Sequence, residues 1–175
     1  MRDLVYSVAA SLDGYIAGPN GEFDWITNDP TIDFGEIFRL FDTAIMGRIC
    51  YQDMLRLGRS PKEFGMKIYI ASTTLNPIEN PGVTIVSADL PNTVSELKRK
   101  SGKAIWLFGG GRTFRSLLDS GLVDRVEVSL VPILLGGGVP LVPSGRRWPL
   151  IFKNSRTFPS GIVSLTNCLA TQPQI

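Results

Sequence analysis

Residues 104–118 read AIWLFGGGRTFRSLL. The apolar run before the glycines predicts a buried strand, and the apolar residues after them recur at helical spacing. When a strand turns into a helix through glycines, the N–H groups at the helix start are unpaired and accessible to an anion. A tight turn with no ligand explains the same residues, because a glycine cluster alone is weak evidence. The stretch therefore predicts an α/β junction and leaves phosphate binding open.

A second junction of the same kind occurs in TAIMGRICYQDM (43–54), where Gly47 and Arg48 repeat the order of Gly111 and Arg112. Each arginine begins a predicted helix and carries a planar cation suited to phosphate. If the two strands are parallel in one sheet, both junctions lie at its carboxyl edge, the usual ligand side of an α/β sheet. Two such sites favour a pyrophosphate over a coincidence, although a lone arginine at either place is more often an exposed helix residue.

The rest of the chain alternates between strand and helix patterns, and strands dominate its end. We expect a three-layer α/β/α fold in which the central sheet is mixed and mostly parallel, with an antiparallel edge, as one domain over residues 1–175. The expected strands are 4–11, 43–47, 67–72, 83–86, 105–108, 125–133 and 161–170, and the expected helices are 33–41, 48–57, 92–100 and 112–120.

Composition excludes several classes of protein. A net charge of +2 with scattered basic residues argues against a nucleic-acid partner, and no apolar run of membrane-spanning length occurs. The N-terminus lacks the apolar core of a signal peptide, so we expect a cytoplasmic protein. The chain has no histidine, which removes Ser-His-Asp and Cys-His catalysis and most zinc sites, and we expect no metal. The chemistry must then rest on a carboxylate, on water or on a bound cofactor.

Several stretches resemble known reductases. MGRICYQDM (46–54), KIYIAST (67–73) and WLFGGGRTF (106–114) are similar to segments of dihydrofolate reductases. The resemblance is closer to the RibD C-terminal family, the reductase domain of riboflavin biosynthesis, and to its small stand-alone relatives. It rests on SLDGYIAGPNGEFDW (11–25), WLFGGG (106–111), DRVEVSLVPILLGGGVPL (124–141) and SRTFPSGIVSL (155–165), in the family's order over nearly the whole chain.

The resemblance implies NADPH lying across the carboxyl edge of the sheet. In that reading, Ala9 and Ile16 flank the nicotinamide, while Ser72 and Thr73 receive the adenosine-side phosphate. The implied phosphate and pyrophosphate contacts are Gly47, Arg48, Gly109, Gly110, Gly111, Arg112 and Thr113. Arg48 together with the two hydroxyls suits a 2′-phosphate and favours NADPH over NADH. Taken alone, Ser72 and Thr73 would be a hydrated loop.

The resemblance is weaker on the substrate side, where it implies Trp25, Asp13 and Phe108. Dihydrofolate reductases carry an acid a few positions past a tryptophan, but here Asp29 and Asp33 stand at other spacings. Asp33 is our candidate catalytic residue, and it is also placed to cap the helix that follows it. Asp13 is expected mainly to form a turn before a glycine. Residues 26–38 hold three acids and no base, which disfavours a phosphorylated substrate.

These observations lead to two hypotheses. The first is an NADPH-dependent oxidoreductase for a small heteroaromatic or carbonyl substrate, pterin-like or pyrimidine-like. The alternative is a nucleotide- or flavin-binding module of the same fold without turnover. We also expect a homodimer, because the late strands at 125–133 and 161–170 carry few charges to protect a sheet edge.

Overall fold

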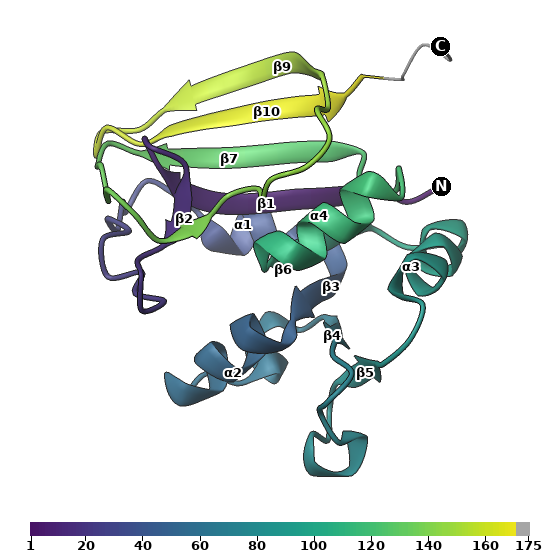
Figure 1. Ribbon diagram of the computed structural model, residues 1–175. Coiled ribbons are helices and arrows are strands. Elements are labelled where there is room, and N and C mark those ends of the chain that lie inside the picture. The colour runs from purple at the N-terminus through teal and green to yellow at the C-terminus, as the bar shows by residue number, and fades with distance from the viewer. Residues whose placement is uncertain (171–175) are drawn as a thin grey trace.

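Eight strands form one central sheet in the order β5-β4-β3-β6-β1-β7-β10-β9 (Figure 1). The structure is a computed structural model and describes residues 1–170. Strands β5 through β7 in this order are parallel, whereas β10 is antiparallel to both of its neighbours. The strands are β1 (Leu4–Ser11), β3 (Phe41–Gly47), β4 (Lys67–Ala71), β5 (Thr84–Val86), β6 (Ala104–Gly109), β7 (Arg125–Val131), β9 (Leu150–Thr157) and β10 (Val163–Leu169).

Helices cover both faces of the parallel part of the sheet, which confirms the predicted three-layer fold. Side chains of α3 and α4 pack with β1, β3 and β6 on one face, and those of α1 and α2 pack with the same strands and β4 on the other. The helices are α1 (Phe34–Arg39), α2 (Arg48–Arg56), α3 (Leu90–Arg99) and α4 (Gly111–Asp119), with short 3₁₀ turns η1 (Pro61–Phe64) and η2 (Pro77–Glu79).

Strand β6 shows why the sequence folds this way. Ile105 and Leu107 point to the α3/α4 face, and Trp106 and Phe108 point to the α1/α2 face. Successive side chains of a strand alternate between faces, so an uninterrupted apolar run is what a strand buried on both faces requires. Because β6 lies between β3 and β1, the glycines that follow it emerge at the centre of the carboxyl edge.

Three strands are not predicted by the sequence pattern. Strands β2 (Tyr15–Ala17) and β8 (Val139–Pro140) form a small two-stranded sheet, and β9 forms one edge of the main sheet. Every residue of β9 is exposed, so LIFKNSRT lacks the alternation that marks a half-buried strand. The expectation that β7 or β10 forms the edge is therefore wrong, and the true edge carries Lys153 and Arg156.

Within residues 1–170, the helices are all too short or too polar to cross a bilayer.

Candidate functional site

The two strand-glycine-helix junctions lie side by side. Strands β3 and β6 are parallel neighbours, and α2 and α4 begin at their carboxyl ends (Figure 1). A Cβ atom placed on Gly110 would lie 3.7 Å from the Cα of Gly47. The prediction that both junctions share one edge of the sheet is confirmed, and the two helix starts are in contact.

Among residues 1–170, no side chain caps either of these helix starts. The N-cap residues are Gly47, with an extended backbone, and Gly110, with φ +92°. In contrast, Asp33 and Asp89 cap α1 and α3 by accepting hydrogen bonds from backbone N–H groups. The first N–H groups of α2 and α4 therefore have no capping partner, and the helix dipoles favour an anion there.

Each of the three central glycines has its own reason for lacking a side chain. A Cβ atom on Gly109 would lie 3.3 Å from the Sγ of Cys50, and one on Gly111 would lie 2.9 Å from the carbonyl oxygen of Pro140. Gly110 instead needs its positive φ, which residues with a side chain rarely adopt. Gly109 and Gly111 are thus explained by packing, and Gly110 makes the turn that exposes the helix start.

Thr113 joins the two junctions. It is nearly buried, and a Cβ atom on Gly47 would come within 2.8 Å of its Oγ1. Arg48 and Arg112 are exposed at the two helix starts, and Arg48 donates to the Gln52 side chain over 2.7 Å. Neither arginine forms an ion pair with any residue in the described part of the chain. Both cations are therefore available to a ligand.

Ser72 and Thr73 follow β4, the strand next to β3. The buried Ser72 Oγ accepts hydrogen bonds from the backbone N–H groups of Thr74 and Leu75, at 3.2 and 3.1 Å. This hydroxyl oxygen shapes its own turn, and Thr73 is exposed beside it. Both residues lie on the expected side of the junctions, and their contact with a phosphate stays a prediction.

Ala9 and Ile16 lie on the other side of the junctions, near the carboxyl end of β1. They belong to different apolar clusters: Ala9 packs against Val131 and Phe158, whereas Ile16 packs against the core beneath α3 and α4. Their common contact with one nicotinamide ring stays a prediction.

The carboxylates on the substrate side already accept hydrogen bonds from the protein. Asp33 caps α1 by accepting from the N–H of Glu36 at 3.0 Å, as its place before the helix predicts. Asp13 accepts from the N–H groups of Leu135 and Gly136, at 3.1 and 2.7 Å, in addition to the Ser11 hydroxyl. Asp13 thus holds a distant loop in addition to its hydrogen bond within its own turn, and these hydrogen bonds lower its pKa.

Trp25 and Phe108 are both half-buried, in separate aromatic surroundings. Phe108 belongs to the cluster under α1 and α2, 4.7 Å from the ring of Trp106. Trp25 packs against the cluster that contains Phe158, as Ala9 does, and its Nε1 donates to the carbonyl of Glu22 at 3.0 Å. Trp25 therefore packs on the same apolar cluster as a predicted nicotinamide contact.

A row of polar residues lies on the same sheet face as Ala9, and the sequence analysis did not predict it. Ala9 pairs in register with Ser129 of β7, and Ser129 pairs with Ser164 of β10, the two hydroxyl oxygens being 2.6 Å apart. Arg156 of β9 pairs with Ser164 and lies 4.6 Å over the ring of Phe158. The sequence analysis did not predict β9, so it could not predict how β9 pairs with β10. The segment SRTFPSGIVSL nevertheless contains Arg156, Phe158 and Ser164.

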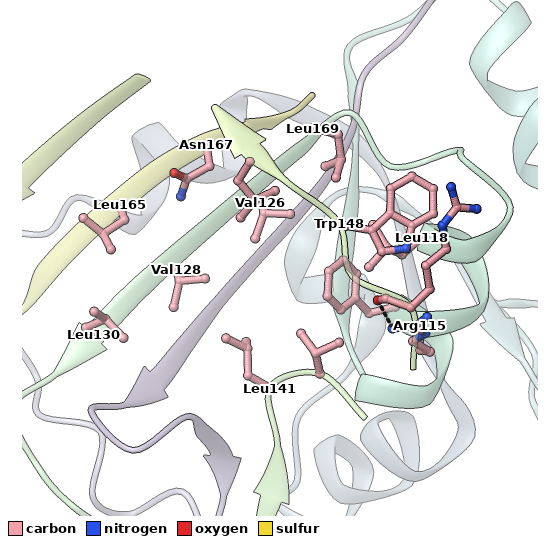
Figure 2. Close-up of a pocket in the computed structure, with 14 residues that line it drawn as sticks. Arg115, Leu118, Val126, Val128, Leu130, Leu141, Trp148, Leu165, Asn167 and Leu169 are labelled. Carbon is pink, nitrogen blue, oxygen red and sulfur yellow. Dashed lines mark hydrogen bonds between the residues drawn. The ribbon is translucent and has the colours of Figure 1, made fainter. Parts of the chain in front are cut away.

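A pocket of about 410 Å³ lies on the opposite face of the sheet, between α4, β7 and β10 (Figure 2). Aliphatic side chains such as Val128, Leu130 and Leu165 line it, together with Trp148. None of the predicted site residues contributes to its lining. The pocket is therefore separate from the glycine junctions.

Comparisons with known proteins agree with this architecture. The chain is 32% identical over 181 residues to the uncharacterised protein YyaP of Bacillus subtilis (strain 168), covering 94% of this chain and 93% of that protein. A crystal structure from Shewanella sp. PV-4, named for riboflavin biosynthesis, matches with a TM-score of 0.83 and 27% identity, over 98% of this chain and 100% of the other.

A more distant match shows the fold alone. The diaminohydroxyphosphoribosylaminopyrimidine deaminase/5-amino-6-(5-phosphoribosylamino)uracil reductase of Thermotoga maritima has a TM-score of 0.71 at 17% identity. The match covers 97% of this chain and 57% of that longer one. The family model of the RibD C-terminal domain matches residues 2–164. The fold is that of dihydrofolate reductase-like proteins, and the chain belongs to the RibD C-terminal domain family.

Proposed function

We propose that this protein is an NADPH-dependent oxidoreductase that transfers a hydride to a small heteroaromatic or carbonyl substrate. The observation that carries the proposal is the pair of adjacent helix starts at Gly47 and Gly110, both without a capping side chain. One phosphate would satisfy one helix start, and a pyrophosphate suits two that touch. The family and its structural neighbours include reductases, which supports the same function.

The residues present fit a dinucleotide. The cradle between Gly47 and Gly110 is one that a side chain would fill, and Arg48 and Arg112 flank it without ion-pair partners in residues 1–170. From a pyrophosphate held there, one arm would extend toward β4 and Thr73, and the other toward β1 and Ala9. This arrangement follows the rule that ligands of α/β sheets bind outside the carboxyl ends of the strands.

Bound NADPH would supply the hydride, and the chain would supply binding and orientation. The helix starts and the two arginines would fix the phosphates, so that the nicotinamide arm reaches the apolar surface around Ala9. Small and apolar groups there would exclude water from one ring face. The proton would come from water or from Asp33, whose carboxylate is exposed at the start of α1.

The proposal is tested by turnover. Purified protein with NADPH and a panel of pterins, pyrimidines, quinones and aldehydes should consume NADPH, measured as loss of reduced-nicotinamide absorbance, for at least one member. The Arg112→Ala variant should lose most of this rate at low NADPH and recover part of it at high NADPH, because the arginine contributes to binding.

A second candidate is a nucleotide- or flavin-binding module without turnover. It is favoured by the carboxylates of Asp13, Asp29 and Asp33, all of which accept hydrogen bonds from the protein itself. Tight NADPH binding without oxidation across the panel would favour this candidate. Steady turnover of any panel member would remove it.

A further inference from the structure

The carboxylate of Asp29 joins two segments that are far apart in the sequence. Its Oδ1 accepts from the N–H and the hydroxyl of Thr31, at 2.9 and 2.6 Å. Its Oδ2 accepts from the N–H of Ser160 at 2.9 Å, across 131 residues of chain. Asp29 is only 3% exposed, and hydrogen bonding from Ser160 and then from Thr31 holds its pKa well below the ordinary range. The carboxylate therefore stays ionised and fully engaged at neutral pH.

The two joined segments form one apolar wall. We call it the Phe158 wall; its buried centre is Val131, Phe158 and Ile162, and Ala9, Trp25, Ile32 and Ile133 pack against it. Trp25 and Ile32 come from the segment that contains Asp29, and Phe158 belongs to the turn that contains Ser160. This turn is closed by hydrogen bonds from Phe158 N to the Ile162 carbonyl and from Gly161 N to the Phe158 carbonyl.

The segment between β2 and α1 has little regular structure to hold it in place. Residues 18–33 contain turns and bends, and most of their side chains are exposed. Segments with few buried contacts open locally at low cost. A charged acceptor that is hydrogen-bonded to N–H groups of two segments links them more strongly than a neutral acceptor would. The Asp29 carboxylate is thus a polar link that holds the Trp25 segment against the cluster of Phe158, on which Ala9 also packs.

We propose that Asp29 is a positioning residue: through Thr31 and Ser160 it holds the Phe158 wall in place against the nicotinamide end of the bound cofactor. The role rests on the proposed function, because Ala9 of this wall is one of the two predicted nicotinamide contacts. The predicted adenosine and phosphate contacts follow β3, β4 and β6, whereas the wall is built on β1, β7 and the turn between β9 and β10. Loss of the link should therefore affect one end of the cofactor only.

The Asp29→Asn variant keeps the size of the side chain and removes half of the link. An asparagine has one acceptor oxygen, so if it accepts from Thr31 it presents an N–H₂ donor to the N–H of Ser160. Thr31→Val is a milder variant, because it removes the hydroxyl donor and leaves the carboxylate bound to both N–H groups. Asp24→Asn is the matched control, because Asp24 is exposed five residues earlier in the same segment.

The test compares two ligands by calorimetry: NADPH, and 2′-phospho-ADP-ribose, which has the same phosphates and adenosine but no nicotinamide. Asp29→Asn should bind NADPH about tenfold more weakly, the loss expected for one charge-assisted hydrogen bond, and bind the fragment within about twofold of wild type. Thr31→Val should show the same split at about threefold. Asp24→Asn should bind both ligands like wild type.

Three results would overturn the proposal. In the first, NADPH affinity is unchanged in Asp29→Asn. In the second, both ligands weaken equally, which indicates a general structural role. The third result applies if Asp29→Asn does not fold and Thr31→Val is measured in its place. It is an equal change in the affinities of Thr31→Val for the two ligands. A wild-type protein that binds neither ligand instead contradicts the proposed function itself, and the role of Asp29 with it.

Discussion

Arg112 is the residue on which the phosphate interpretation depends most directly. It is exposed at the first turn of α4, next to N–H groups without a capping partner. Arg112→Ala should weaken NADPH binding tenfold to a hundredfold, because a lost charge-assisted contact costs about 1.5–3 kcal/mol. Unfolding stability should change by only about 0.5 kcal/mol, as for most surface substitutions. Fluorescence titration and urea unfolding measure the two effects.

Arg99→Ala is the control for Arg112, because Arg99 is exposed at the end of α3. It should leave NADPH affinity unchanged. Equal affinity in Arg112→Ala and wild type would remove Arg112 from the site.

Asp33 carries two predictions that substitutions can separate. Its cap on α1 is confirmed, and its catalytic role is still a prediction. Asp33→Ala should reduce the unfolding free energy by about 1 kcal/mol, whereas Asp33→Asn should retain the cap. If Asp33 handles a proton, both variants should lose turnover of an identified substrate while NADPH affinity is kept. Full turnover in Asp33→Asn would assign the residue to capping alone.

At the residue scale, the sequence predicts types of role better than it predicts partners. The position of Asp33 before an apolar-periodic run predicts its cap, which depends on local spacing. Asp13 and Asp29 bind N–H groups more than a hundred residues away, and no local pattern contains that information.

At the scale of elements, the contact between the two junctions can be tested through Gly47. A Cβ atom there would lie 2.8 Å from Thr113 Oγ1, so Gly47→Ala forces Thr113, in the first turn of α4, to shift. We expect a loss of about 1–3 kcal/mol in unfolding free energy, as for other overpacking changes, together with weaker NADPH binding. Gly137→Ala is the matched control, because a Cβ atom there meets nothing within 4 Å. Urea unfolding and NADPH titration of both variants check this, and identical behaviour of the two would contradict it.

The loop that Asp13 holds gives a pH dependence. Hydrogen bonds from the Ser11 hydroxyl and from two backbone N–H groups lower the Asp13 pKa in the folded state. A lowered carboxyl pKa means that the stabilisation is complete above the unfolded pKa, about 3.9, and is lost as pH falls through the folded value. The difference in urea midpoint between wild type and Asp13→Asn should therefore be full at pH 6 and shrink below about pH 4. A difference that grows on acidification would contradict this assignment.

The elements themselves were largely predictable. Strand β6 is buried on both faces and reads as an apolar run, and α4 follows with a clear helical period. Strand β9 is exposed along its length, and β2 and β8 are only three and two residues long. Their sequences therefore lack the alternation of apolar and polar residues that predicts a half-buried strand. With β9 missing from the prediction, the polar row from Ala9 to Arg156 could not be assembled.

At the scale of the whole molecule, we propose a homodimer for a revised reason. In the described residues 1–170, the face formed by β7, β10 and β9 has no helix beyond α4, and it presents apolar residues around the pocket (Figure 2). At the edge, Phe152 is 60% exposed and Leu150 is 45% exposed. Exposed apolar surface of this kind marks an interaction site, and a two-fold dimer is the commonest closed assembly.

Light scattering tests the assembly. The chain mass is 19.2 kDa, so a dimer should give about 38 kDa at micromolar concentration. Phe152→Glu should shift the mass toward that of the monomer, and Lys153→Glu on the same strand should leave the dimer intact. A monomer mass for the wild-type protein would contradict the proposal.

Cofactor binding is the central claim, and direct titration of the wild-type protein with NADPH tests it best. Calorimetry should show one NADPH per chain with micromolar or tighter affinity, and weaker binding of NADH because it lacks the 2′-phosphate. The absence of heat and of tryptophan quenching at millimolar NADPH would contradict the account, because the two uncapped helix starts at Gly47 and Gly110 would then have no ligand to explain them.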